Sequence, residues 1–168
     1  MNNNLSLYEI EYALARKFDI RQNIIVPNIS WGLRIHECDL FIVNNNGYAI
    51  EIEIKRSKAD LKNDFKKIHN HKDYYNRIKH FYYAIPYQLY ESCKDLFPEN
   101  AGIICIFKNS YGRIYCKIMK RAKVNKTCRK LTNEEILHVA KLGTMRIWNL
   151  KQKLINYTNK NNNNNNKI

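Results

Sequence analysis

Hydrophobic and polar residues alternate most regularly in two runs between Glu37 and Lys55, separated by an Asn-Asn-Asn-Gly stretch. Successive side chains of a β-strand point to opposite faces, so each run has an aliphatic face and a face that carries acids. The aliphatic face is predicted to hold Cys38, Leu40 and Ile42 from the first run and Tyr48, Ile50, Ile52 and Ile54 from the second. Gly47 can adopt a positive φ, and the short Asn/Gly connection predicts a β-hairpin. The two acidic faces then bring Asp39, Glu53 and Lys55 together at one site.

Helical periodicity replaces this alternation on both sides of the hairpin. The spacing of apolar residues predicts helices over 5–18, 57–78 and 87–97, and strands over 23–31, 80–86, 102–107 and 113–119. Pro27 favours an edge position for the first of these strands, because proline cannot donate to a sheet ladder. A last helix is predicted to start near residue 131. There, Thr132 and Glu135 have the spacing of a capping box, Leu131 and Ile136 that of a hydrophobic staple, and Gly143 is a candidate break.

The length of 168 residues favours a single domain, which we expect to span residues 1–157. Residues 158–168 are almost all Asn and Lys, so we expect a disordered tail. The five cysteines are widely spaced and form no C-x-x-C pair, which predicts reduced thiols and a cytoplasmic protein. The chain opens on no charged-then-apolar leader, and no apolar run approaches the length of a bilayer, so no membrane association is expected.

Charge is distributed unevenly along the chain. Residues 1–107 carry 14 Lys/Arg and 13 Asp/Glu, whereas residues 108–168 carry 15 Lys/Arg and 2 Asp/Glu. Such a basic block favours a polyanionic partner, with nucleic acid first and acidic lipid second. The competing interpretation is a basic surface that only keeps the protein in solution. The candidate nucleic-acid-binding residues are Lys117, Lys120, Arg121, Lys123, Lys126, Arg129 and Lys130.

One acid lies inside the apolar stripe of the first predicted helix. Glu11 falls between Leu7 and Leu14, and burying an unpaired charge is costly. It therefore either forms a salt bridge or joins the hairpin acids in a metal site. Carboxylates without His or Cys suit a hard cation such as Mg²⁺ or Mn²⁺, which activates water and neutralises a phosphodiester. Lys55 lies two residues from Glu53 on one strand face, within reach of both water and phosphate.

The pattern Glu11, Asp39 and Glu53-Ile54-Lys55 resembles the PD-(D/E)XK nuclease superfamily, with Cys38 in place of the name-giving Pro. The resemblance implies an α/β fold with a restriction-endonuclease-like αβββαβ core. A mixed central sheet would be flanked by helices, with a β-hairpin and a C-terminal helix added. It also implies that Asp39, Glu53, Glu11 and the Ile54 carbonyl surround the metal, and that Lys55 orients water or stabilises charge.

A longer string, EIEIKRSKADLKNDF followed by HFYYAIP, is similar to a compact bacterial and phage branch described as DNA-repair or predicted nucleases. Ser57, Asp60 and Asp64 belong to that wider pattern. Asp60, Asp64, Lys67 and His71 also recur at helical spacing, so ordinary pairing on a helix surface competes with a role in lining the site. Glu51 is a second acid on the face of Glu53 and leaves the ligand register open. A zinc site at His69 and His71 with a distant Cys is a weak alternative.

The function expected from these features is Mg²⁺- or Mn²⁺-dependent hydrolysis of DNA in repair, recombination or processing of phage and mobile elements. Two alternatives stay open: a non-catalytic nucleic-acid-binding protein with the same fold, and an enzyme that cuts structured RNA. The resemblance also allows a homodimer.

Overall fold

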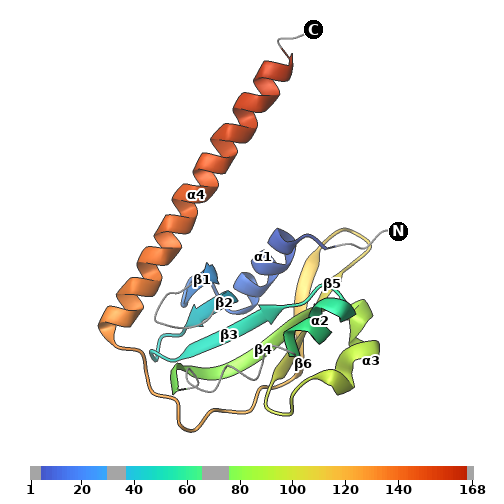
Figure 1. The fold of residues 1–168 in the computed structure, drawn as a ribbon, viewed down its shortest axis with the longest axis vertical. Coiled ribbons are helices and arrows are strands. Elements are labelled where there is room, and N and C mark those ends of the chain that lie inside the picture. Colours follow the sequence, from blue (N-terminus) through green and yellow to red (C-terminus); the bar gives the residue numbers. More distant parts are fainter. Residues whose placement is uncertain (1–4, 30–36, 66–75, 166–168) are drawn as a thin grey trace.

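The computed structural model describes residues 5–29, 37–65 and 76–165 of the chain. Their elements are arranged as shown in Figure 1. In chain order they are α1 (Leu7–Lys17), β1 (Ile24–Ile29), β2 (Cys38–Val43), β3 (Ala49–Ile54), α2 (Lys58–Phe65), β4 (Ile78–Pro86), η4 (Tyr87–Leu89), α3 (Tyr90–Cys93), η5 (Lys94–Leu96), β5 (Gly102–Lys108), β6 (Ile114–Lys120) and α4 (Asn133–Asn165).

The strands form one six-stranded sheet in sequence order, from β1 to β6. β1, β2 and β3 pair antiparallel, β3, β4 and β5 pair parallel, and β6 returns antiparallel to β5. The carboxyl ends of β3, β4 and β5 consequently lie at the same edge of the sheet. This mixed sheet flanked by helices confirms the α/β class, and the expected order α1-β1-β2-β3-α2-β4 is present. β1 is an edge strand, as Pro27 predicts.

The predicted hairpin is formed by β2 and β3. Leu40 lies opposite Ile52, and Phe41 lies opposite Glu51. The turn is closed by Asn44, whose side-chain oxygen accepts from the backbone N–H groups of Asn46 and Tyr48 at 3.0 Å each. Gly47 has a φ of 77°, the left-handed region in which a Cβ would add strain.

Both faces of the sheet are covered. On one face, the aliphatic residues of the hairpin pack against Ile10 and Leu14 of α1. On the other face, Phe41 and Val43 pack with Val139 of α4, and a neighbouring cluster joins α2 and α3 to β4 and β5. Cys38 packs with Phe41 rather than with Leu40, so its predicted face is wrong. β1 is irregular beside it, because Asn28 has a φ of 52°.

Two predicted helices differ from the structure. Helix α2 is described from Lys58 to Phe65, where this stretch of described residues stops, and Ile78, predicted as the last residue of that helix, instead starts β4. Ile78 is buried with Phe41 in the sheet, so packing overrides the local helical spacing. The expected helix over 87–97 is divided into η4, α3 and η5.

Helix α4 begins as predicted. The Thr132 backbone N–H donates to Glu135 at 2.8 Å, and the Glu135 N–H donates to the Thr132 hydroxyl at 3.2 Å, which completes the capping box. The predicted break at Gly143 is wrong. A Cβ at that position would lie 3.1 Å from a Val26 methyl, so the glycine lets α4 approach β1 without interrupting the helix.

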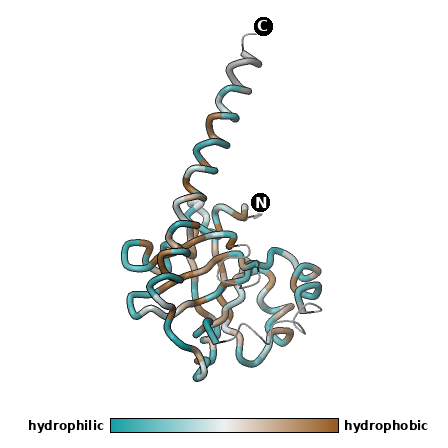
Figure 2. Tube along the Cα trace, turned by 60° about the vertical axis from the view of Figure 1, so that its left-hand side comes forward, coloured by the Kyte–Doolittle hydropathy of each residue, from teal (hydrophilic) through white to brown (hydrophobic). Residues whose placement is uncertain are grey.

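The second half of α4 projects away from the sheet (Figure 1). The helix has 33 residues and continues through Asn165, although the sequence predicts a disordered tail after Tyr157. Brown, hydrophobic segments alternate with polar ones along its projecting part (Figure 2). In the described part of the chain, neither this helix nor any other is long and apolar enough to cross a membrane.

Candidate functional site

Lys55 is the central residue of the candidate site. It directly follows β3, and its backbone N–H donates to the Ala84 carbonyl of β4 at 2.9 Å. Its side chain is 9% exposed, and Nζ lies 2.8 Å from Glu53 Oε2 and 2.9 Å from Asp64 Oδ1. Burial alone would lower the pKa of Lys55, but the two carboxylates outweigh that effect and raise it. The ammonium therefore stays charged and bridges two acids.

Glu53 is held in an environment that opposes its ionisation. Burial first, and then the charge of Asp39, raise the pKa of Glu53 to about 8, although Lys55 acts in the opposite direction. Its Oε1 atom is buried and finds no hydrogen-bond partner among the described residues. Glu53 Oε2 therefore contacts the Lys55 ammonium, and Oε1 is left able to carry a proton or to bind a cation.

Asp39 connects the two strands of the hairpin at the site. Its Oδ2 accepts a hydrogen bond from the Ile54 backbone N–H at 2.7 Å. The charge of Asp39 contributes to the raised pKa values of both Glu53 and Glu11. Asp39 is therefore electrostatically coupled both to Glu53 of β3 and to Glu11 of α1.

The remaining candidate acid, Glu11, lies on α1. Its Oε1 accepts from the Asn28 side-chain amide at 3.2 Å. Burial raises the pKa of Glu11, and Asn28 partly offsets that effect. Among the described residues, Glu11 forms no ion pair with Lys or Arg, so the salt-bridge explanation for its position is not supported there.

The acids of α2 have two different roles. The Ser57 hydroxyl accepts from the Asp60 N–H at 3.1 Å, and Asp60 accepts from the Arg56 N–H at 3.3 Å, so this pair forms the start of the helix. Asp64, one turn later, contacts Lys55 and accepts from the Tyr83 hydroxyl at 2.9 Å. Asp64 therefore lines the site. Lys67, His69 and His71 lie outside the described residues.

Tyr83 is a site residue that the sequence does not identify. It is fully buried in β4, opposite Glu53 in the parallel ladder. The two residues before it, Phe81 and Tyr82, are also aromatic, and the register between β3 and β4 cannot be read from either segment alone. The alternation of β4 indicates only which of its aromatic residues share a face.

Glu51 lies deeper in the sheet than Glu53. It is 2% exposed and lies between Phe41 of β2 and Phe81 of β4. Its charge makes a small contribution to the raised pKa of Glu53. Glu51 remains a secondary candidate, while Glu53 is the acid in contact with Lys55.

The donor atoms at the site suit a hard divalent cation. Within residues 5–29, 37–65 and 76–165, no three His, Cys, Asp or Glu side chains are grouped closely enough to hold a metal ion. Mg²⁺, however, commonly uses one or two carboxylates and completes its shell with waters and phosphate. The unpartnered Glu53 oxygen beside the charge of Asp39 fits that mode. The three-carboxylate set of Asp39, Glu53 and Glu11 stays a prediction.

Part of the predicted basic surface is used within the protein. Lys120 Nζ donates to the Pro98 carbonyl at 3.0 Å, and Lys123 pairs with Glu99. Arg129 donates two bonds of 2.7 Å to Glu135. Lys117, Arg121 and Lys126 are exposed, and Lys130 lies with its Nζ 5.6 Å from the centre of the Tyr48 ring. These contacts fix the irregular segment after β6 and leave part of its charge on the surface.

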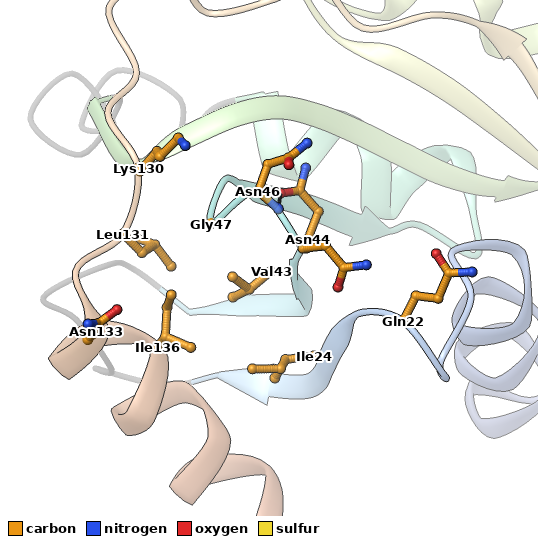
Figure 3. Close-up of a pocket in the computed structure, with 11 residues that line it drawn as sticks. Gln22, Ile24, Val43, Asn44, Asn46, Gly47, Lys130, Leu131, Asn133 and Ile136 are labelled. Carbon is orange, nitrogen blue, oxygen red and sulfur yellow. Dashed lines mark hydrogen bonds between the residues drawn. The ribbon is translucent and has the colours of Figure 1, made fainter.

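A cavity of about 390 Å³ lies at the opposite end of the hairpin from Glu53 (Figure 3). Asn44, Asn46 and Gly47 of the turn line it, together with Lys130 and residues at the start of α4. None of the candidate catalytic acids lines this cavity. The structure therefore separates it from the carboxylate–lysine cluster, by which we mean Asp39, Glu53, Lys55 and Asp64.

Comparison with known proteins identifies the fold alone. No family model and no curated protein matches the chain. A solved structure of a protein of unknown function from Silicibacter pomeroyi is similar, with a TM-score of 0.59 and 17% identity over 92% of each chain. At this identity the likeness extends to the arrangement of the elements and not to an activity.

Proposed function

We propose that this protein is a metal-dependent nuclease that hydrolyses DNA phosphodiester bonds, built on a restriction-endonuclease-like core. One observation carries the proposal: a buried Glu53 with a pKa of about 8 and an unpartnered oxygen lies beside Lys55 and the charge of Asp39. The order α1-β1-β2-β3-α2-β4 supports it, because this is the element order of the core that the Glu11, Asp39, Glu53 and Lys55 pattern resembles.

Each residue of the carboxylate–lysine cluster has a distinct role in the proposal. Asp39 and Glu53 would hold a divalent cation, which when bound lowers the pKa of a water and neutralises phosphate charge. A cation held there would favour the ionised form of Glu53, because its positive charge would offset the repulsion from Asp39. Lys55 donates to the attacking water or to a phosphate oxygen, and Asp64 positions its ammonium, with the Tyr83 hydroxyl holding Asp64 in turn.

The charge of the C-terminal part supports nucleic acid as the substrate. The exposed Lys117, Arg121 and Lys126 lie on or after β6, in a stretch without acids. Neutralising phosphates releases counterions, so DNA binding should weaken steeply with salt. Substitution of these three residues should reduce that salt dependence.

A second candidate is a nucleic-acid-binding protein without turnover. The absence of three grouped ligating side chains in the described part of the chain favours it. The two candidates make different predictions for a cleavage assay, because only the enzyme requires Asp39 and Lys55.

The decisive experiment compares the wild type with Asp39→Ala and Lys55→Ala on supercoiled, linear and branched DNA, in Mg²⁺, Mn²⁺ or EDTA. Asp95→Ala and Lys94→Ala are matched controls, because both residues are exposed and remote in sequence from the cluster. We expect metal-dependent cleavage by the wild type and both controls, and none by the two site variants. Equal cleavage by the wild type and the site variants would overturn the proposal that this protein is a nuclease. Salt-sensitive DNA binding without cleavage would support the second candidate. A structured RNA in the same assay tests the remaining substrate class.

A further inference from the structure

Three aromatic rings form a continuous stack at one end of the sheet. Tyr87, directly after β4, stacks on Phe107 of β5 with ring centres 4.5 Å apart and an angle of 27°. Phe107 stacks on Tyr115 of β6 at 5.1 Å and 8°. We call these three residues the aromatic ladder. The outer rings keep much of their surface in solvent, since Tyr87 is 43% and Tyr115 49% exposed.

Packing of the protein accounts for the centre of the ladder and not for its ends. Phe107 is partly buried against the cluster that contains Tyr83, and cross-strand aromatic pairs stabilise sheets. Tyr87 and Tyr115 present ring surface that no described residue covers fully. A flat aromatic surface at both ends of a stack suits another flat ring.

The surroundings of the ladder favour an anionic ligand. Ile114, Cys116 and Ile118 of β6 pack toward α1, so the alternation places Tyr115 and Lys117 together on the opposite face. Arg113 precedes this strand and, like Lys117, is exposed. The sequence from Lys108 to Lys130 contains nine basic residues and no acid. Exposed rings among positive charges are the combination by which proteins hold single-stranded nucleic acid.

The ladder lies at the same edge of the sheet as the carboxylate–lysine cluster. Lys55, Tyr87 and Phe107 occupy the carboxyl ends of β3, β4 and β5, which run parallel (Figure 1). In the strand register, Glu53 of β3 lies beside Tyr83 of β4, and Tyr83 lies beside Ile103 of β5. Phe107 lies four residues after Ile103 on β5 and therefore on the same face of the sheet. Two strand spacings, about 10 Å, separate β3 from β5.

We infer that the aromatic ladder is a stacking subsite for unpaired nucleotides beside the proposed phosphodiester site. This inference rests on the proposed function for its substrate and extends it, because it selects strands with exposed bases. Bases paired inside a duplex cannot offer their faces to Tyr87 and Tyr115, whereas the unpaired bases of single strands, overhangs and branch points can.

The test measures binding of a fluorescent oligo(dT) strand and of a blunt duplex by anisotropy, without divalent metal, so that cleavage does not interfere. The variant is Tyr87→Leu/Tyr115→Leu, and the control is Tyr111→Leu, a 93% exposed tyrosine in the turn between β5 and β6 that is not part of the ladder. We expect the double variant to bind the single strand about tenfold more weakly or worse, because each stacked base contributes substantially. Its binding to the duplex and the binding of the control to both ligands should stay within about twofold of the wild type.

Unchanged binding of the single strand by a folded double variant would overturn the subsite. Equal weakening for strand and duplex would overturn it as well, because the variant would then have lost general DNA binding. The single substitution Tyr115→Leu gives a milder test if the double variant unfolds, and a loss confined to the single strand supports the subsite. Failure of the proposed function is distinguishable: it appears as absence of cleavage by the wild type, whatever the ladder binds.

Discussion

Two carboxylates of this protein have similar side-chain exposure to solvent and opposite electrostatics. The side chains of Glu53 and Glu135 are 13% and 14% exposed, and each contacts a cationic side chain. Hydrogen bonding by Arg129 is the main reason that the pKa of Glu135 falls to about 2, whereas burial raises that of Glu53 to about 8. Contact with a cation therefore does not decide the charge state of a buried acid.

The difference lies in how strongly burial acts on each acid, which is the largest influence on the pKa of Glu53 only, and in how completely the carboxylate oxygens are satisfied. Both oxygens of Glu135 accept from Arg129, and the acid also accepts from Arg77 and from the backbone of Thr132. Glu53 accepts one hydrogen bond from Lys55, whose ammonium also contacts Asp64. The charge of Asp39 opposes the ionisation of Glu53. Glu135 thus holds the segment before α4 in place, whereas Glu53 keeps one buried oxygen without a hydrogen-bond partner among the described residues.

The largest expected difference between the two acids is in cleavage. Glu53→Gln preserves shape and removes the negative charge, so we expect cleavage of DNA to fall by about 100-fold or more. Glu135→Gln should cleave within about twofold of the wild type when both are assayed well below their unfolding temperatures. Initial rates on the same plasmid measure both. A Glu53→Gln variant as active as Glu135→Gln would remove the functional distinction between the two acids.

The order reverses for stability. Glu135→Ala leaves two arginines without their acid and opens the capping box, so the free energy of unfolding should fall by about 3 kcal/mol at pH 7. The free energy of unfolding of Glu53→Gln should not fall, because this substitution removes a charge that few hydrogen bonds satisfy. Urea unfolding of both variants measures the difference, and Thr132→Ala, which removes only the cap, should cost about 1 kcal/mol. A larger loss for Glu53→Gln would show that its ion pair stabilises the fold.

The pH dependence of stability should also differ in sign. An ordinary Glu has a pKa of 4.5, and the pKa of Glu53 reaches about 8 in the folded protein. The free-energy cost of keeping Glu53 ionised in the fold is therefore absent below pH 4.5 and complete above pH 8. Glu53→Gln should therefore gain stability over the wild type across that range, on the order of a few kcal/mol in metal-free buffer. The contribution of Glu135 is present above pH 4.5 and lost as pH falls through about 2. Urea titrations at several pH values test both, and a constant difference between Glu53→Gln and wild type would contradict the raised pKa.

The smallest expected effect tests the support of Lys55. Tyr83→Phe removes the hydroxyl that donates to Asp64, and should lower the free energy of unfolding by about 1 kcal/mol. Cleavage should fall only a few-fold, because Asp64 keeps its contact with Lys55. Tyr90→Phe, on α3, is the control. A Tyr83→Phe variant with wild-type stability and cleavage would show that this bond does not position the cluster.

Local patterns within the sequence determined much of the fold. Alternation predicts β2, β3 and their turn, because side chains of a strand have a period of two. The capping box at Thr132 and Glu135 predicts the start of α4, because it depends on residues three apart. The same local patterns place Asp39, Glu53 and Lys55 near one another, since all three belong to one hairpin and its end.

Tertiary structure decided what depends on contacts between distant segments. The start of β4 follows from the burial of Ile78, which its own helical spacing does not reveal. The pairing of β3 with β4 brings Tyr83 opposite Glu53, and the packing of α2 brings Asp64 to Lys55. The ion pair between Glu135 and Arg77 also depends on tertiary packing, because the two residues lie far apart in the sequence. Periodicity reports which side of an element is buried, and only packing decides which atoms meet there.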